Sequence, residues 1–346
     1  MRDDDKLLDL PTAQFGSGVI GVCDICGTRQ AVIVLQKERY KLCVIDFLNK
    51  AWLKSDKKPG APAPVYRSER AWFPTTALKG GKAPAILLVP TKPVRHPGVL
   101  LTPDVYGITT TLLDGAIRLA REGFEVMIPD LVKTEGVGPG HHLRMRAGSR
   151  FRGGVAVTSK GVDHLVRLYA DALEFLRGRE MIDPAKTAIF GTSYGATLGL
   201  ALAARDTKLT AVAVAYPVAL QPADLLKLVS VPLLYVAGSD DPVAKRARGQ
   251  IEVAAAAMKA KVEYVELAAV RHDFLSRDLA AYDLARAEEA WGRIVAFLKQ
   301  QLMPPPPRPP PPPVKVAVPA PATPSKPVAP AALTAAASVA ATPGRA

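Results

Sequence analysis

Short apolar segments alternate with amphipathic helical patterns over residues 65–301 of this 346-residue chain. Consecutive parallel strands need a crossover connection, so this alternation predicts an α/β fold whose mostly parallel sheet carries helices on both faces. In such sheets the functional residues follow the carboxyl ends of strands. We predict strands at residues 83–89, 98–101, 125–128, 187–190, 211–215, 233–236 and 262–267, and helices at residues 110–122, 160–178, 194–205, 243–259 and 281–301.

The chain is basic, with 45 Lys and Arg against 32 Asp and Glu and a net charge of +13. A basic protein attracts polyanions, but these charges are dispersed and accompany no nucleic-acid recognition motif, so we expect no nucleic-acid partner. The N-terminus lacks the basic start and apolar run of a signal peptide, and no segment has the roughly 20 apolar residues that cross a bilayer. The sequence therefore predicts a cytoplasmic protein that has no membrane partner.

Composition divides the chain into four predicted segments. A cysteine-containing module covers residues 15–56, a polar linker residues 57–64, the α/β domain residues 65–301, and a Pro/Ala-rich tail residues 302–346. The tail cannot bury enough apolar surface to offset its loss of conformational entropy, so we expect it to be disordered. Its polyproline run suits either a spacer or an aromatic-lined groove, and the sequence identifies no partner for it.

The strongest local motif is Gly191-Thr192-Ser193-Tyr194-Gly195, which has the form G-x-S-x-G. It follows an apolar predicted strand and begins a helix of small residues, which is the context that the motif requires. There the serine occupies a sharp turn between strand and helix, and the flanking glycines avoid steric clashes. The pattern predicts that Ser193 is a nucleophile.

A serine hydroxyl needs a base within hydrogen-bonding reach, and in this fold the partners follow in the order Ser, acid, His. His272 is the only histidine after Ser193 and follows the last predicted strand. Two aspartates, Asp240 and Asp241, follow the strand at residues 233–236. We choose Asp241 as the acid that orients His272, and Asp240 remains the alternative. The aspartate that is not catalytic fits a helix N-cap.

Residues 65–301 resemble the dienelactone hydrolase family of the α/β-hydrolase fold. The resemblance rests on the segment 97–107, PGVLLTPDVYG, on the segment 119–130, LAREGFEVMIPD, and on the order of the serine, aspartate and histidine segments. It implies that Asp104 takes the position of the family's active-site glutamate and contacts substrate. It also implies that the backbone N–H groups of Val105 and Tyr194 form an oxyanion hole. Serine in place of the family's best-known cysteine nucleophile favours esters.

A basic segment follows the predicted strand at 125–128. Residues 131–160 contain a single acid, Glu135, among eight basic or histidine side chains. One of its arginines could bind a substrate carboxylate through two hydrogen bonds, which predicts an anionic substrate. A solvated, glycine-rich loop is the alternative.

The N-terminal module contains Cys23-x-x-Cys26 and, sixteen residues later, Cys43-x-x-Asp46. The pattern is similar to a zinc ribbon whose fourth ligand is aspartate, and zinc accepts carboxylate oxygen as well as thiolate sulfur. A structural zinc ion on Cys23, Cys26, Cys43 and Asp46 is therefore predicted. A degenerate site without metal, and redox-active or merely buried thiols, are the alternatives.

Together these patterns predict a serine hydrolase that cleaves small carboxylic esters or lactones through an acyl-enzyme and needs no cofactor for catalysis. A hydrolase fold that serves only as a scaffold or binding protein, and an acyltransferase, remain alternatives. Fold alone does not decide between them.

Overall fold

The computed structural model describes residues 13–15, 21–25, 27–28, 30–31, 33–35, 40–49, 65–78, 80–104, 107–130, 159–220, 223–255, 257, 261–277 and 279–303. The predicted linker at residues 57–64 lies outside these ranges, as does the predicted tail beyond Met303. None of the described helices is long and apolar enough to cross a bilayer.

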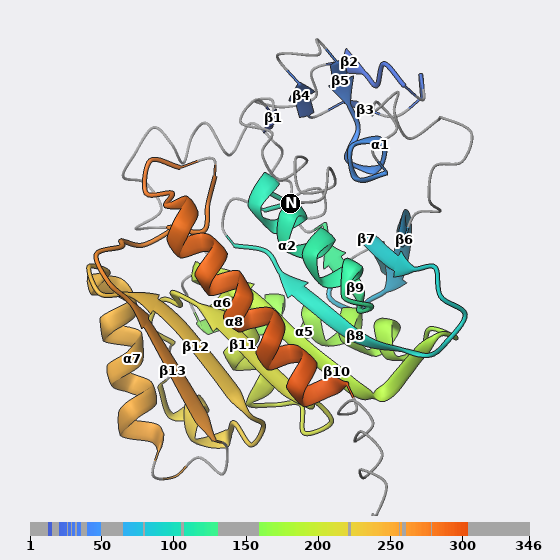
Figure 1. The fold of residues 1–346 in the computed structure, drawn as a ribbon. Coiled ribbons are helices and arrows are strands. Elements are labelled where there is room, and N and C mark those ends of the chain that lie inside the picture. Colours follow the sequence, from blue (N-terminus) through green and yellow to red (C-terminus); the bar gives the residue numbers. More distant parts are fainter. Residues whose placement is uncertain are drawn as a thin grey trace, which may run out of the picture. The chain divides into compact units, whose positions relative to one another are not determined.

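An eight-stranded sheet forms the centre of the fold (Figure 1). Its order is β13-β12-β11-β10-β8-β9-β7-β6. The six strands from β13 to β9 pair parallel with one another, and β7 runs antiparallel to both of its neighbours, β9 and β6. The predicted α/β-hydrolase fold with a mostly parallel sheet is thus confirmed. The strands are β6 (Tyr66–Pro74), β7 (Lys82–Pro90), β8 (His96–Thr102), β9 (Glu125–Pro129), β10 (Ile182–Thr192), β11 (Ala211–Ala215), β12 (Leu233–Gly238) and β13 (Val262–Leu267).

Helices cover both faces of the sheet, as Figure 1 shows. On one face, α2 packs on β7 and β9 while α8 packs on β10, β11 and β12; on the other face, α5 and α6 pack on β10. The central strands β11 and β12 are buried along their whole length, which explains their continuous apolar sequences. The helices are α2 (Thr110–Arg121), α5 (Ser159–Arg177), α6 (Ser193–Ala203), α7 (Pro242–Ala255) and α8 (Leu284–Leu302), with a 3₁₀ helix, η5 (Ala223–Leu228).

The sequence did not predict the edge strand β6. Its buried and exposed positions nearly alternate, and the exposed ones include Arg67. Charged residues on an edge strand limit pairing with other chains, but they also dilute the apolar signal by which we assigned the other strands. β6 pairs antiparallel with β7 from Tyr66 opposite Pro90 to Pro74 opposite Lys82.

The N-terminal residues form short antiparallel strands and one short helix. β1 (Ala13–Phe15), β4 (Ile33–Leu35) and β5 (Tyr40–Leu42) make a three-stranded sheet, β2 (Gly21–Val22) pairs with β3 (Gln30–Ala31), and α1 covers Val44–Leu48. The end of α1 contacts β6, because the Tyr66 hydroxyl donates to the carbonyl of Leu48 at 3.2 Å and the backbone N–H of Ser68 donates to the Asn49 side chain at 3.0 Å.

Candidate active site

Ser193 lies at the sharp turn between β10 and α6, and its backbone φ is +49°. This left-handed conformation is strained for a residue with a Cβ. A Cβ on Gly191 would lie 2.2 Å from Thr102 Oγ1, and one on Gly195 would lie 2.1 Å from the Thr102 carbonyl oxygen. The two glycines of the motif are therefore required by the close approach of β8 to the turn.

Thr102, the last residue of β8, holds this turn in place. Its hydroxyl donates to the Gly195 carbonyl at 2.8 Å, and its side chain is fully buried. The hydrogen bond connects the strand that ends before Asp104 to the first turn of α6. Sequence analysis did not identify Thr102, because a buried threonine has no pattern that separates it from other core residues.

The structure brings Ser193, His272 and Asp241 into one hydrogen-bonded series. Ser193 Oγ lies 2.9 Å from His272 Nε2, and His272 Nδ1 lies 2.6 Å from Asp241 Oδ2. The three side chains come from the carboxyl ends of β10, β13 and β12, which the parallel register brings to the same edge of the sheet. The geometry allows Nε2 to take the serine proton while Asp241 holds Nδ1.

The two neighbouring aspartates differ in what they contact. Asp241 is fully buried, and its Oδ1 accepts hydrogen bonds from the backbone N–H groups of Val243 and Ala244, both at 2.9 Å. Asp240 is exposed and accepts from the Ser239 hydroxyl at 3.0 Å. Asp241 thus caps α7 through one oxygen and contacts His272 through the other.

The Asp241–His272 contact shifts the pKa of both partners. Burial raises the pKa of Asp241, but hydrogen bonds from His272 and from the Ala244 amide lower it more, so it lies below its ordinary value of 3.8. Burial lowers the pKa of His272, but its hydrogen bond to Asp241 and the nearby charges of Asp273, Asp241 and Asp104 raise it above 6.5. The contact with Asp241 therefore stabilises an imidazolium when His272 takes up a proton.

Asp273 and Tyr216 also contact His272, and sequence analysis missed both. Asp273 Oδ1 lies 3.8 Å from His272 Nε2. The Tyr216 ring meets the imidazole edge-on, with centroids 5.0 Å apart. Both residues have positive φ, +64° and +40°. A non-glycine residue with positive φ directly beside the predicted nucleophile or base indicates a constrained site, but φ is not readable from the sequence.

Of the three residues predicted from the family resemblance, the structure describes Asp104 and Tyr194 but not Val105. Asp104 lies just after β8, and its charge contributes to the raised pKa of His272. Burial is the main cause of the raised pKa of the Tyr169 and Tyr216 hydroxyls, and the charge of Asp104 adds to it. Tyr194 follows Ser193 in the first turn of α6 and is buried. Val105 lies outside the described residues, so the predicted oxyanion hole stays a prediction.

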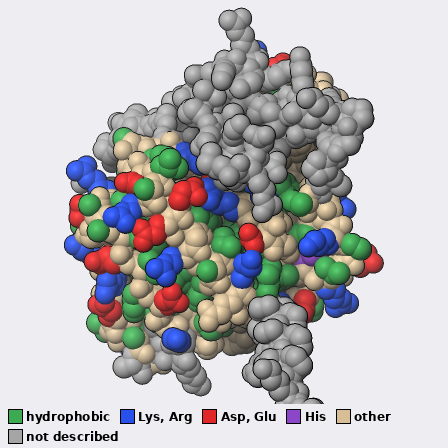
Figure 2. Space-filling view, viewed as in Figure 1, with side chains coloured by type: hydrophobic (Ala, Val, Ile, Leu, Met, Phe, Trp, Pro, Cys, Tyr) green, Lys and Arg blue, Asp and Glu red, His purple; other side chains and the backbone are tan. Residues whose placement is uncertain are grey.

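The basic segment that we predicted to bind an anionic substrate lies outside the described residues up to position 158. Figure 2 shows Lys and Arg side chains interspersed with Asp and Glu on the visible part of the described surface. The described charges that act on His272 are the carboxylates of Asp104, Asp241 and Asp273.

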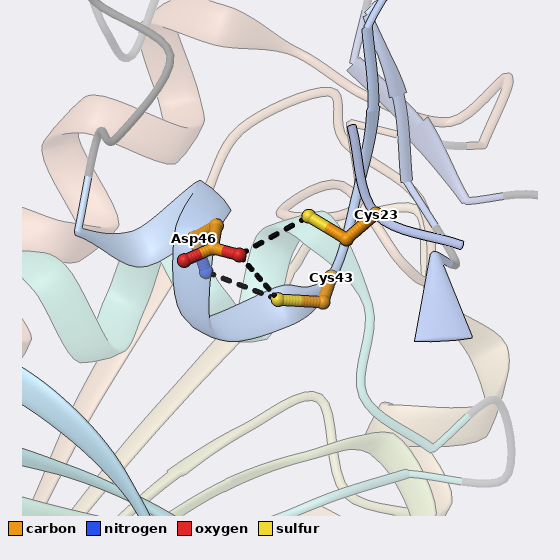
Figure 3. A group of neighbouring side chains, drawn as sticks. All are labelled: Cys23, Cys43 and Asp46. Atoms are coloured by element: carbon orange, nitrogen blue, oxygen red, sulfur yellow. Dashed lines mark hydrogen bonds between the residues drawn. The ribbon is translucent and has the colours of Figure 1, made fainter. Parts of the chain in front are cut away.

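The predicted metal ligands Cys23, Cys43 and Asp46 lie together in the N-terminal part, as Figure 3 shows. Their ligand atoms are all within 4.8 Å of one another, and the three side chains are buried. The fourth predicted ligand, Cys26, lies outside the described residues.

Comparison with known proteins places this arrangement in a family. A model of the dienelactone hydrolase family matches residues 83–302. No curated protein matches the chain. Among solved structures, a protein from Klebsiella pneumoniae described as a dienelactone hydrolase shares 20% identity and a TM-score of 0.57, covering 67% of this chain and 99% of its own.

Two further structures have different described activities. A dienelactone hydrolase-like promiscuous phosphotriesterase from metagenomic libraries shares 19% identity and a TM-score of 0.53, covering 68% of this chain and 98% of its own. An esterase from the archaeon Pyrobaculum calidifontis shares 17% identity and a TM-score of 0.50, covering 68% and 86%. At these identities the likeness shows the fold, whereas the family match covers more than half of the sequence. The chain belongs to the dienelactone hydrolase family.

Proposed function

We propose that this protein hydrolyses carboxylic esters or lactones through an acyl-enzyme on Ser193. The observation that supports this most is the continuous hydrogen-bonded series from Ser193 Oγ through the His272 ring to Asp241. A nucleophile, a base and a group that orients the base are the three parts that nucleophilic catalysis by serine requires. Membership of a hydrolase family agrees with that chemistry.

In the first half of the reaction, Ser193 Oγ adds to the acyl carbon while His272 Nε2 takes its proton. Asp241 fixes the ring so that Nδ1 keeps its proton and Nε2 presents a lone pair. The imidazolium that forms is stabilised by the same carboxylate. When the bond from the acyl carbon to the leaving oxygen breaks, Nε2 returns the proton to that oxygen, and the acyl group stays on Ser193.

In the second half, water replaces the alcohol. Nε2 takes a proton from the attacking water, the bond between the acyl carbon and Ser193 Oγ breaks, and the proton goes to Oγ. We assign the oxyanion of both tetrahedral intermediates to the backbone N–H groups of Tyr194 and Val105. One such donor typically lowers the barrier by about 3 kcal/mol. These steps use only the side chains and amides of the chain.

We propose that the substrate is an anionic ester, because the segment at residues 131–160 is rich in basic side chains that could bind a carboxylate. The test compares kcat/KM for two esters, one that carries a carboxylate and one in which that carboxylate is replaced by a neutral carboxamide while the scissile ester is kept. A preference for the anionic ester that falls with added salt supports it, because salt screens charge attraction. Equal rates would remove the proposal and leave a neutral ester or lactone.

The nucleophile is tested with a p-nitrophenyl ester and a fluorophosphonate probe. Ser193→Ala is expected to lose hydrolysis by about 10⁴-fold or more and to lose all labelling, because the proposed acyl-enzyme forms on the hydroxyl that this substitution removes. Ser239→Ala is the matched control, since this serine lies in the loop after β12 and contacts Asp240. A folded wild-type protein that neither hydrolyses nor labels would overturn the proposal and favour a scaffold.

A further inference from the structure

The cluster of Cys23, Cys43 and Asp46 joins two separate segments of the N-terminal part. Cys23 follows β2, Cys43 immediately precedes α1, and Asp46 lies within α1. Figure 3 shows both thiols directed at the Asp46 carboxylate. Cys23 Sγ and Cys43 Sγ donate to the same oxygen, Asp46 Oδ2, at 3.1 and 3.0 Å.

The surroundings of this carboxylate favour a cation. Asp46 is 7% exposed, Cys23 1% and Cys43 0%. A cation stabilises a buried carboxylate, and zinc accepts thiolate sulfur and carboxylate oxygen in the same site. The two thiols can also lose their protons and become ligands. We propose that Cys23, Cys43 and Asp46 bind one structural zinc ion.

The chemistry of the ligands selects the metal. Two thiolates favour a soft or borderline ion such as Zn²⁺ over Mg²⁺ or Ca²⁺, which prefer oxygen ligands. At the usual bond lengths of zinc, tetrahedral ligand atoms lie about 3.4–3.8 Å apart, a spacing compatible with the 4.8 Å limit of the cluster. Zinc binding displaces the two thiol protons, which go to solvent, and the positive ion then lies between two thiolates and the Asp46 carboxylate.

Burial and position give the ion a structural role. The three side chains are too buried to admit a substrate, which favours a structural ion over a catalytic one. Zinc would fasten the Cys23 turn to α1. The carbonyl of Ile45 accepts from the Ser68 hydroxyl at 3.4 Å and the Asn49 side chain accepts from it at 2.7 Å, so α1 in turn is bonded to β6. The ion thus stabilises the helix that contacts the edge strand.

The full-length protein, reduced and purified without chelator from zinc-supplemented cells, is the sample for the test. We expect about one zinc per chain by elemental analysis. Replacement by Co²⁺ should give a thiolate-to-cobalt charge-transfer band in the near ultraviolet. Cys23→Ser, Cys43→Ser and Asp46→Asn should each lose most of the metal. Asp24→Asn is the matched control, because Asp24 lies in the same part and its contact is a hydrogen bond from the Lys41 amide, which asparagine can also accept.

Three results would overturn the site. The first is a folded wild-type protein that binds neither zinc nor cobalt. The second is a disulfide between Cys23 and Cys43 in protein purified under nitrogen. The third is full zinc content in Asp46→Asn together with both cysteine variants, which would place the metal elsewhere. Cobalt titration of the wild-type protein gives an answer even where a variant does not fold.

Asp273 carries a second inference, which rests on the proposed function. Its φ of +64° is a conformation that costs most side chains energy, and its Oδ1 is buried with no hydrogen-bond partner among the described residues. That oxygen lies 3.8 Å from His272 Nε2, the atom that faces Ser193. Asp273 thus adopts an unfavourable backbone conformation that places an unpartnered carboxylate oxygen near the ring nitrogen that exchanges the proton.

One water molecule can satisfy both atoms. Groups 3.8 Å apart can each reach a shared water at about 2.8 Å, and water commonly satisfies buried polar groups. We infer that Asp273 positions the water that attacks the acyl-enzyme. This water donates one hydrogen to Nε2 and the other to Asp273 Oδ1. As its oxygen adds to the acyl carbon, Nε2 takes the first proton and passes it to Ser193 Oγ when the acyl–Oγ bond breaks. Asp273 undergoes no net proton exchange.

Pre-steady-state kinetics with a p-nitrophenyl ester separates the two halves of the reaction. Asp273→Asn should keep the burst of p-nitrophenol and slow the steady state about tenfold or more, because the water is no longer held. The acyl form of Ser193 should accumulate in mass spectra. Hydroxylamine should restore turnover, since it attacks without a positioned partner. Asp240→Asn is the control that should change neither phase.

The inference fails if Asp273→Asn shows no more acyl-enzyme than the wild type, or if its defect lies in the burst. Neither result would contradict the assignment of Ser193 as the nucleophile. Failure of the proposed function has a different signature, because Ser193→Ala would then retain the burst or the wild type would form no acyl-enzyme.

Discussion

Asp241 and Asp46 are both buried aspartates close to the beginning of a helix, and each accepts through Oδ2 from a titratable partner. Their donors differ. Asp241 receives two backbone amides on Oδ1 and an imidazole on Oδ2. Asp46 receives two thiols on one oxygen. The first carboxylate is held rigidly by strong neutral donors, and the second has donors that metal can deprotonate.

This difference indicates that the partners, more than the burial, determine what a buried carboxylate does. The hydrogen bond from His272 and those from the two amides lower the pKa of Asp241, and the amides also fix the carboxylate. Asp241 can therefore hold one ring nitrogen while the other exchanges a proton. In the second cluster both thiols can lose their protons and bind a cation together with the carboxylate.

Asp241→Asn should lower kcat by about 10⁴-fold, because the amide NH₂ would face Nδ1 and favour the wrong tautomer of His272. Oδ1 of asparagine can still accept from Val243 and Ala244, so the fold should persist. Steady-state kinetics and circular dichroism check this. Asp240→Asn serves as the control with near wild-type activity. If Asp240→Asn lost far more activity than Asp241→Asn, Asp240 would be the acid that orients His272.

Removal of the metal should lower stability and leave esterase activity unchanged, whereas Asp241→Asn should lower activity and leave the fold unchanged. A chelator should lower the thermal midpoint of the wild type by a few degrees or more, since a ligand that binds only the folded state stabilises it by mass action. Differential scanning calorimetry measures the shift. Asp46→Asn should already be less stable and should not respond to chelator, and esterase activity below the transition should be retained. A chelator response that is the same in Asp46→Asn would contradict the assignment.

The two clusters also differ in how far sequence could predict them. The G-x-S-x-G motif, the position of His272 after a strand and the cysteine spacing all depend on local order along the chain. The structure brings together Ser193, His272 and Asp241, and it also brings together Cys23, Cys43 and Asp46. The predicted ligand Cys26 lies outside the described residues. Asp273 and Tyr216 could not be predicted, because their importance depends on a positive φ and on contacts with His272 that tertiary packing creates. The edge strand β6 was missed because its charged positions weaken the apolar pattern.

The pH profile tests the charge around His272. As a base, His272 must be neutral, and its pKa lies above 6.5, so kcat/KM should fall as pH decreases through that raised value. Among the described residues, the carboxylates of Asp241, Asp273 and Asp104 each raise the pKa of the ring. Asp273→Asn removes one negative charge and should move the acidic limb of kcat/KM to lower pH. A limb that stays in place would mean that Asp273 does not act on the imidazole, whereas Asp240→Asn should leave it unchanged.

The smallest expected effect concerns the connection between the metal cluster and the sheet. The Ser68 hydroxyl donates to the Asn49 side chain, which directly follows α1, so Ser68→Ala should cost about 1 kcal/mol of unfolding free energy in the metal-loaded protein. If zinc is what holds α1 in position, the same substitution should cost less after chelation, because Asn49 would no longer be held against β6. Urea unfolding of both proteins with and without chelator forms a thermodynamic cycle that measures this coupling. Equal costs in the two conditions would mean that α1 contacts β6 independently of the metal, and the ion would then stabilise only the Cys23 turn.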